Sequence, residues 1–401
     1  MPGLESERWD AELPPPLMTS ERGSFARSTI VERKPQIIQR VIEDNNYPED
    51  IVRALEAFRR EIASQPIQPL REQASDVAFW NRELAAHQGK TWLDVPWYFA
   101  ETFFYRRLLE AVGYFQPGPL EGHDPFAEQK RQQESEAVEQ LTESWGQLVD
   151  AEPGLVFEAL LHSCLWGNRA DLSNTTVDIQ VRGGLAAREE RSHILIDDTE
   201  KVEELLTGGL PRVDFINDNV GLELLFDMAL TDFVLVQGMA REEVLHLKDR
   251  PFFVSDALVT DARTTVALLR AAPDAAVREL GTRLQEHIAG GRLVLKDHQF
   301  WTSCFAFRQM SPPLRADLAG ADLVILKGDV NYRRLVDDRH WPHSALLEDV
   351  AGDFPRPFLV LRTLKGEIMV GLSPGQAEKL AAEDSAWLIN GKRGIIQLVT
   401  K

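Results

Sequence analysis

The sequence predicts an α/β fold in which helices cover a parallel sheet, preceded by an N-terminal region that is all-helical. Two observations support this prediction. Apolar residues recur at helical spacing through about the first 150 residues. After Leu155, short β-rich runs alternate with helical stretches. This alternation is typical of parallel sheets, because the return to a parallel strand needs a long crossover, which is usually a helix.

The N-terminal region starts with a polar, proline-rich leader at 1–22, and we expect a helical domain at 23–155. Pro35 marks a break or a first turn in the first helix. The aromatic residues at 97–115 follow helical spacing, so we expect them in the core. The spacing of apolar side chains predicts helices at 28–45, 48–64, 76–88, 96–115 and 126–151.

The α/β domain is expected at 156–401. A long, mostly helical segment near 258–318 interrupts the alternation of strands and helices, and we expect it to be an insertion near the sheet edge. Short β-rich runs that end in polar residues predict strands at 193–196, 213–216, 233–236, 252–254, 323–326 and 358–361.

Composition and charge exclude several classes of protein. The 401 residues include 63 acidic and 44 basic side chains, a formal net charge of −19, so we expect no nucleic-acid partner. No apolar run approaches the roughly 18 residues that span a bilayer, and the N-terminus lacks a secretion signal. Cys164 and Cys304 cannot form a disulfide framework, and no Cys/His cluster suggests zinc. We therefore expect a cytoplasmic protein without a membrane partner.

Polar residues follow four of the expected strands, where ligands gather in open α/β sheets. The strand at 213–216 leads to Asp218, Asn219 and Glu223, and the strand at 252–254 leads to Asp256. The other two strands lead to Asp329, Asn331, Tyr332 and Arg333, and to Arg362 and Lys365.

These residue types suit a divalent metal ion and a phosphate. Asp218, Asn219 and Asp256 offer hard oxygen ligands, which Mg²⁺ or Mn²⁺ prefers. Lys365 and Arg333 supply positive charge for phosphate oxygens. Hydroxyl groups or an attacking water could be held by the remaining polar side chains, Asp329, Asn331 and Glu223. The combination is typical of a site that hydrolyses a phosphate monoester.

Each of these residues also has a structural interpretation. An Asp or Asn at a strand end commonly caps a helix or forms a turn. Gly328-Asp329 alone is an ordinary turn, and Arg362 or Lys365 alone is a solvated charge. Composition and spacing therefore leave both interpretations open and name no substrate.

Other motifs favour structural roles. Asp197-Asp198-Thr199 is best explained as a helix cap, strengthened by acidic residues in the first turn. The sequence contains no Walker A motif and no GxGxxG after a strand, which argues against P-loop and dinucleotide chemistry. Core or surface roles are expected for the histidines at His162, His246, His298, His340 and His343.

Four runs of the sequence match motifs of a known family. They are 218–224 (Asp-Asn-Val-Gly-Leu-Glu-Leu), 253–256 (Phe-Val-Ser-Asp), 327–333 (Lys-Gly-Asp-Val-Asn-Tyr-Arg) and 362–365 (Arg-Thr-Leu-Lys). With these motifs, the chain resembles the metal-dependent damage-control phosphatases, and more narrowly their Arg-Thr-x-Lys subfamily. One animal member of that subfamily carries the name of a methyltransferase. Family-like sequence also occurs at 24–35, 105–107, 124–126 and 165–173.

The resemblance implies a helical N-terminal domain, a Rossmann-like α/β domain and one divalent ion, Mn²⁺ or Mg²⁺, with Co²⁺ and Ni²⁺ as alternatives. By motif position, the metal ligands and catalytic residues would be Asp218, Asn219 and Asp256. The substrate would be contacted by Glu223, Asp329, Asn331, Tyr332, Arg333 and Lys365, with Asn168 and Asp171 nearby. The implied substrates are small phosphorylated metabolites, especially sugar phosphates such as fructose 1-phosphate and fructose 6-phosphate. Lys365 would meet the phosphate, and Asp218 or Asp256 the attacking water.

Two alternative functions stay open. The first is a protein carboxyl methyltransferase that uses S-adenosylmethionine, but a glycine-rich loop is missing, because Val220-Gly221-Leu222 holds one glycine. The second is a non-catalytic sugar-phosphate-binding protein, and the complete set of polar site residues weighs against it. The sequence does not indicate an oligomeric state.

Overall fold

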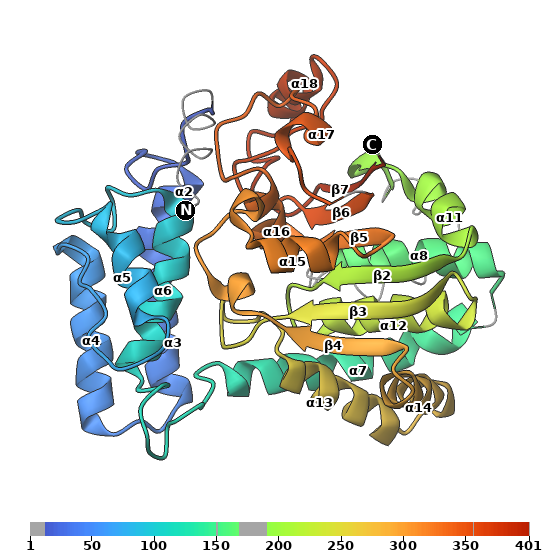
Figure 1. The fold of residues 1–401 in the computed structure, drawn as a ribbon, viewed down its shortest axis with the longest axis horizontal. Coiled ribbons are helices and arrows are strands. Elements are labelled where there is room, and N and C mark those ends of the chain that lie inside the picture. Colours follow the sequence, from blue (N-terminus) through green and yellow to red (C-terminus); the bar gives the residue numbers. More distant parts are fainter. Residues whose placement is uncertain (1–12, 150, 168–190, 356, 401) are drawn as a thin grey trace. The chain divides into compact units, whose positions relative to one another are not determined.

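A computed structural model describes residues 13–149, 151–167, 191–355 and 357–400 (Figure 1). The chain divides into two units. The first unit is formed by Met1–Gly122, Arg333–Gly352 and Gly366–Leu388, and the second by His123–Tyr332, Asp353–Lys365 and Ile389–Lys401. No described helix combines the length and the apolar composition needed to cross a membrane.

The first unit consists mainly of helices, and the predicted helical N-terminal region is confirmed. Pro35 lies in the first turn of α3, in agreement with the predicted break or first turn. The expected helix at 28–45 is present as α2 and α3 joined by η1, a short π-helical turn. The helices are α2 (Phe25–Ser28), η1 (Thr29–Arg33), α3 (Lys34–Asp44), α4 (Glu49–Ser64), α5 (Val77–Ala85), α6 (Trp97–Ala111), α17 (Leu347–Val350) and α18 (Gln376–Glu383).

Helix α6 forms the aromatic core of this unit. Its side chains Phe99, Phe103 and Phe104 are buried, which confirms the expectation for the aromatic residues of this helix. Phe104 stacks on Phe58 of α4 with ring centroids 5.4 Å apart, and Phe103 lies 5.5 Å from Trp80 of α5. The aromatic side chains thus hold three helices together.

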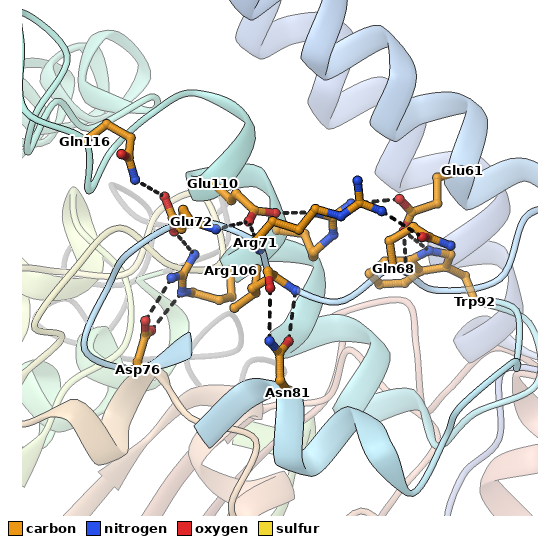
Figure 2. A network of polar contacts seen from close by, with 12 residues as sticks. Glu61, Gln68, Arg71, Glu72, Asp76, Asn81, Trp92, Arg106, Glu110 and Gln116 are labelled. Carbon is orange, nitrogen blue, oxygen red and sulfur yellow. Dashed lines mark hydrogen bonds and ion pairs between the residues drawn. The ribbon is translucent and has the colours of Figure 1, made fainter. Parts of the chain in front are cut away.

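Buried ion pairs attach the segment before α5 to α6 (Figure 2). Arg106 donates through Nε and Nη2 to Asp76, at 2.7 and 2.8 Å, and its Nη1 lies 2.7 Å from Glu72. Glu110 accepts from the backbone N–H groups of Arg71 and Glu72, at 2.6 and 3.1 Å. Arg106 is only 2% exposed, so its charge depends on these carboxylates for compensation.

The second unit contains a seven-stranded sheet with the strand order β1-β7-β6-β5-β2-β3-β4. Neighbouring strands are parallel except for the β6–β7 pair, which is antiparallel. The predicted α/β fold with a mostly parallel sheet is therefore confirmed. The strands are β1 (Ile194–Asp197), β2 (Leu210–Ile216), β3 (Ala240–Leu247), β4 (Leu293–Asp297), β5 (Leu323–Lys327), β6 (Phe358–Thr363) and β7 (Gly394–Val399).

Helices cover this sheet. Figure 1 shows α8 and α12 behind the strands; α12 packs on β3, and α8 packs on α12, β6 and β7. Helix α16 (Gly328–Leu335) carries the chain from the second unit into the first. The other elements are α7 (Ala127–Val149), α8 (Pro153–Trp166), α11 (Thr199–Thr207), α12 (Leu222–Val236), α13 (Val259–Ala271), α14 (Ala275–Ala289), η2 (Gln299–Thr302), η3 (Phe307–Gln309) and α15 (Pro312–Leu318).

Two of the expected strands are wrong. Residues 233–236 form the last turn of α12, whose residues are buried nearly all round, and a short apolar run cannot distinguish such a helix from a strand. Residues 252–254 form a turn, in which Phe253 and Val254 have φ values of 46° and 69°. Strands β3, β4 and β7 were not predicted, and β4 lies inside the segment 258–318.

The buried ion pairs of Arg106 lead to a first prediction. We expect Arg106→Met to destabilise the protein by about 3–5 kcal/mol, because it leaves Glu72 and Asp76 without their cation. Urea denaturation followed by circular dichroism measures this change. Arg53→Met is the control, because Arg53 pairs with Glu49 on the surface, and it should change stability by less than about 0.5 kcal/mol. Equal losses in the two variants would contradict the prediction.

A second prediction concerns a buried carboxyl group on β3. Glu243 is 2% exposed, and its Oε2 has no hydrogen-bond partner among the described residues. Burial raises the pKa of Glu243 from 4.5 to about 8, while the nearby Thr231 hydroxyl opposes the shift and the charge of Asp214 adds to it. Between these two pH values the folded state binds more protons than the unfolded state, so stability falls as the pH rises.

Glu243→Gln removes this titration. We therefore expect the melting temperature of the variant to improve relative to the wild type as the pH is raised from about 5 to about 8.5. Scanning calorimetry at several pH values measures the difference. Glu242→Gln, on the same strand, controls for the effect of an added amide. A difference between wild type and Glu243→Gln that does not change with pH would show that Glu243 titrates normally.

Candidate functional site

The candidate site lies at one edge of the sheet in the second unit. Strands β6, β5, β2 and β3 are consecutive neighbours in the sheet and run parallel. Their carboxyl ends therefore meet at the same edge, which is where open α/β sheets bind ligands. The polar residues predicted after β2, β5 and β6 all follow strands that end there.

The loop after β2 pairs with the loop after β3. Asn219 and Asp256 form an isolated antiparallel bridge. The backbone N–H of Ala257 donates to the carbonyl oxygen of Asp218 at 2.8 Å, and that of Val220 donates to Ser255 at 2.7 Å. These bonds bring Asp218, Asn219 and Asp256 together, although two of them precede α12 and the third follows β3.

The Asn219 side chain is held from both ends. Its Nδ2 donates to Oδ2 of Asp218 at 2.9 Å and to Oε2 of Glu223 at 3.0 Å. Its Oδ1 accepts a hydrogen bond from the Ser255 hydroxyl at 2.6 Å. Because Nδ2 donates to these two carboxyl groups, Oδ1 faces the Ser255 hydroxyl on the other side.

Two buried lysines, which sequence reasoning did not assign to the site, pair with these carboxylates. Lys327 lies 3.0 Å from Oδ1 of Asp227 and 3.2 Å from Oε1 of Glu223, and it also donates to the carbonyl oxygen of Cys164. Lys248 lies 3.1 Å from Oδ2 of Asp256 and donates to the carbonyl oxygen of Asn217 at 3.0 Å. Lys248 directly follows β3, a strand that was not predicted, so no signal pointed to it.

Negative charge exceeds positive charge in this buried cluster. Burial raises the pKa of Asp218 well above its usual range, and the charges of Asp256 and Glu223 add to the shift. The ammonium groups oppose it. Burial likewise raises the pKa of Asp227 to about 6 against the opposing charge of Lys327. The cluster contains four carboxyl groups and two ammonium groups, Asp218, Asp227, Asp256, Glu223, Lys248 and Lys327, so its formal charge is −2.

The same cluster fits a divalent cation. Oδ1 of Asp218 is buried and has no hydrogen-bond partner among the described residues, as expected for an oxygen that faces a cation. Within the described part of the chain, no three carboxylate, imidazole or thiolate side chains form a ready metal cage. The ligands on offer are hard oxygens of Asp218, Asn219 and Asp256, a set that suits Mg²⁺ or Mn²⁺ with water or substrate oxygens in the remaining positions.

Gly328 lets the end of β5 approach this cluster closely. Its φ is 79°, and a Cβ atom added there would overlap Oδ2 of Asp218 and lie 2.6 Å from its Cγ. Only glycine provides both this backbone conformation and this close approach. Gly328 therefore keeps the start of α16 in contact with the Asp218 carboxylate.

Asp329, Asn331 and Tyr332 follow on α16. Arg362 of β6 donates to Oδ1 of Asp329 through Nε at 2.8 Å and Nη2 at 2.6 Å, and its guanidinium lies 4.1 Å from the Tyr332 ring centroid. Arg362 is 0% exposed, so its interpretation as a solvated charge is wrong. Asn331 donates to backbone carbonyl groups of Lys327, Ile216 and Asn217, at 2.8, 3.2 and 3.3 Å, which ties α16 to the end of β2.

The remaining predicted site residues have different locations. Lys365 follows β6 and is half-buried, and a Cβ atom at Gly391 would lie 3.6 Å from its Cε. Arg333 belongs to the first unit, where it pairs with Asp338 and lies 4.0 Å over the Trp97 ring, and its contact with the substrate stays a prediction. Asn168 and Asp171 lie outside the described residues.

All five histidines that were given structural roles have protein partners. His246 lies 2.9 Å from Asp214, His162 lies 3.3 Å from Thr199, and His298 accepts from the backbone of Phe300 at 3.0 Å. His340 pairs with Glu21, and His343 contacts the carbonyl oxygen of Met369 at 2.8 Å. These contacts agree with their interpretation as core or surface residues.

Comparison with known proteins gives one consistent family. The family model of the damage-control phosphatase ARMT1-like domain matches residues 29–380. Damage-control phosphatase ARMT1 of Xenopus tropicalis is 33% identical, over 96% of this chain and 99% of that protein. The protein of the same name from Homo sapiens is also 33% identical, over 96% of this chain and 99% of its own length.

A solved structure supports the fold. The crystal structure of a DUF89 family protein from Pyrococcus horikoshii matches with a TM-score of 0.50 and 15% sequence identity. The match covers 93% of this chain and 97% of that chain. At this identity the similarity extends to the fold alone.

The close approach at Gly328 is testable. We expect Gly328→Ala to destabilise the protein by about 1–3 kcal/mol more than Gly291→Ala, because only the first variant drives a methyl group into the Asp218 carboxylate. Gly291 is a matched control, since its φ is 73° and nothing lies within 4 Å of an added Cβ. Urea denaturation measures both variants, and an equal loss would mean that the contact with Asp218 does not constrain residue 328.

Proposed function

This chain belongs to the damage-control phosphatase ARMT1-like family and is a phosphatase, and we propose that Asp218, Asn219 and Asp256 hold the divalent ion on which its reaction depends. The observation that carries this proposal is that a buried cluster holds four carboxyl groups and two ammonium groups, a formal excess of two negative charges. Burying uncompensated carboxylates is costly, and one divalent cation would neutralise the excess. Oδ1 of Asp218, which has no hydrogen-bond partner among the described residues, supports the same location.

The proposed ion would act as a Lewis acid, polarising a phosphate oxygen and lowering the pKa of a water molecule. The side chains around it have separate tasks. Glu223 and Ser255 orient the Asn219 amide through hydrogen bonds of 3.0 and 2.6 Å. Asp218 or Asp256 accepts the proton of the attacking water. Both carboxylates lie at the edge of the sheet where the substrate phosphate would approach.

Burial separates the substrate-contacting residues from the supporting ones. Asp329 and Lys365 are half-buried, so a ligand arriving from solvent can reach them. We assign the phosphate to the ammonium group of Lys365 and a substrate hydroxyl group to Asp329. The nearly complete burial of Glu223, Asn331 and Tyr332 favours roles in holding the site together.

The proposed substrates are small sugar phosphates, with fructose 1-phosphate and fructose 6-phosphate as the first candidates. A sugar phosphate presents both groups that the site addresses, a phosphate for Lys365 and the metal, and hydroxyl groups for Asp329. The family name supports phosphorylated metabolites in general, and the choice of sugar phosphates rests on this match of chemical groups and on the resemblance of the motifs.

Phosphate release from chelator-treated protein tests the proposal. The panel contains fructose 1-phosphate, fructose 6-phosphate and an aryl phosphate, each with Mg²⁺, Mn²⁺, Co²⁺ or Ni²⁺. We expect release only after a metal is added, and a loss of at least about 100-fold in kcat/KM for Asp218→Asn, because the variant weakens the metal site. Asp353→Asn, at an exposed residue outside the site, should keep wild-type activity.

Metal binding is measured separately by thermal shift, because a cation that binds only the folded state raises the melting temperature. We expect stabilisation of the wild type and a smaller effect in Asp218→Asn. A variant that binds metal but loses turnover would identify its carboxylate as the base. Folded wild-type protein that releases no phosphate with any metal would overturn the proposal. Binding of fructose 6-phosphate without turnover would then indicate a sensor, and methyl transfer from S-adenosylmethionine a methyltransferase.

A further inference from the structure

Arg362 is a buried cation with two partners on one helix. It lies on β6, whose six residues are all buried, and it is 0% exposed. Its Nε and Nη2 both point to Oδ1 of Asp329, and its guanidinium stacks on Tyr332, one turn further along α16. An isolated guanidinium at this depth would be strongly destabilising, so the ion pair with Asp329 stabilises it.

Asp329 is one residue away from a backbone contact with a proposed metal ligand. It directly follows Gly328, whose Cα approaches the Asp218 carboxylate so closely that a Cβ atom cannot be accommodated. The Asp329 side chain is 20% exposed, whereas Arg362 is 0% exposed. Of this pair, Asp329 is the group that a ligand can touch, and Arg362 supports it from beneath.

Arg362 also leads to Lys365, three residues later in the chain. The segment between them is anchored, because the Thr363 hydroxyl donates to the carbonyl oxygen of Leu165 at 2.8 Å and the backbone N–H of Leu364 donates to Arg393 at 2.8 Å. The ion pair between Arg362 and Asp329 therefore connects the start of α16 to the segment that carries Lys365.

We propose that Arg362 is a positioning residue of the phosphatase site: it holds the Asp329 carboxylate, and the segment that ends in Lys365, in place beside Asp218. The inference rests on the proposed function and adds to it a residue that touches neither metal nor substrate. Its role is to determine how tightly the phosphorylated substrate binds, while metal affinity depends on the loops after β2 and β3.

Lysine cannot replace Arg362 in this role. The planar guanidinium directs two N–H groups at one oxygen while its face lies on Tyr332, and an ammonium group offers neither feature. We expect Arg362→Lys to raise KM and the dissociation constant for fructose 6-phosphate about tenfold or more. We expect kcat to change less, and the affinity for Mn²⁺ to stay unchanged.

The control is an arginine outside the site that also directs Nε and Nη2 at one carboxylate oxygen. Arg283 directs Nε and Nη2 at Oδ2 of Asp232, at 3.0 and 2.7 Å, between α14 and α12. Arg283→Lys should therefore leave KM, kcat and Mn²⁺ affinity at wild-type values. Calorimetric titrations with Mn²⁺, and with fructose 6-phosphate in metal-free protein that does not hydrolyse it, supply the binding constants, and melting temperatures show that each variant is folded.

A double-mutant cycle tests whether Arg362 acts through Asp329. If it does, Arg362→Lys should cause little further loss of substrate affinity in a protein that already carries Asp329→Asn. Additive losses would overturn the proposal, and so would a loss of Mn²⁺ affinity that matches the loss of substrate affinity. If Arg362→Lys fails to fold, Asp329→Asn alone breaks the ion pair from its half-buried side, and an unchanged KM in that variant would refute the role.

The experiment distinguishes a wrong substrate assignment from a wrong role for Arg362. Wild-type protein that neither binds nor hydrolyses fructose 6-phosphate would overturn the substrate assignment and the role of Arg362 together. Wild-type protein that binds it, with Arg362→Lys indistinguishable from Arg283→Lys, would overturn only the role of Arg362.

Discussion

The second unit is organised around an excess of buried negative charge. Asp218, Asp256, Glu223 and Asp227 lie at the carboxyl edge of the sheet, and among the described residues Lys248 and Lys327 compensate them. Such a cluster is stable only when every charge has a defined partner. Several elements supply the groups of this cluster. Helix α12 supplies two of the carboxylates, α8 supplies a carbonyl oxygen for Lys327, and the loop after β3 supplies a third carboxylate.

The backbone beside the cluster adopts unusual conformations at two places. Phe253 and Val254 adopt positive φ values in the turn before Asp256, a conformation that costs energy in residues with side chains. The pairing of that turn with the loop after β2 offsets the cost. Gly328 adopts its positive φ without this cost, and its missing side chain allows β5 to end against Asp218. Strain and close approach are thus found in two of the segments that border the cluster.

A phosphatase needs its metal ligands and its substrate-binding groups in a fixed relation, and this fold provides it through parallel strands. Asn331 ties α16 to the end of β2, and Arg362 ties β6 to α16, so the groups on separate strands are connected by direct contacts. The proposed division of tasks follows: the loops after β2 and β3 hold the cation, and α16 with the end of β6 holds the phosphorylated substrate.

The sequence by itself determined helices α3 to α7, strands β1, β2, β5 and β6, and the polar residues that follow β2, β5 and β6, because each depends on local periodicity or on a contiguous motif. It did not determine β3, whose charged residues Arg241, Glu242 and Glu243 hide its strand character, and Lys248 was missed with it. Only the tertiary structure decided which charges are compensated. Lys327 and Cys164 are 163 residues apart, and Arg362 and Asp329 are 33 apart. A local pattern carries no information about such partners. The sequence alone therefore cannot distinguish a buried arginine that forms an ion pair from a solvated one.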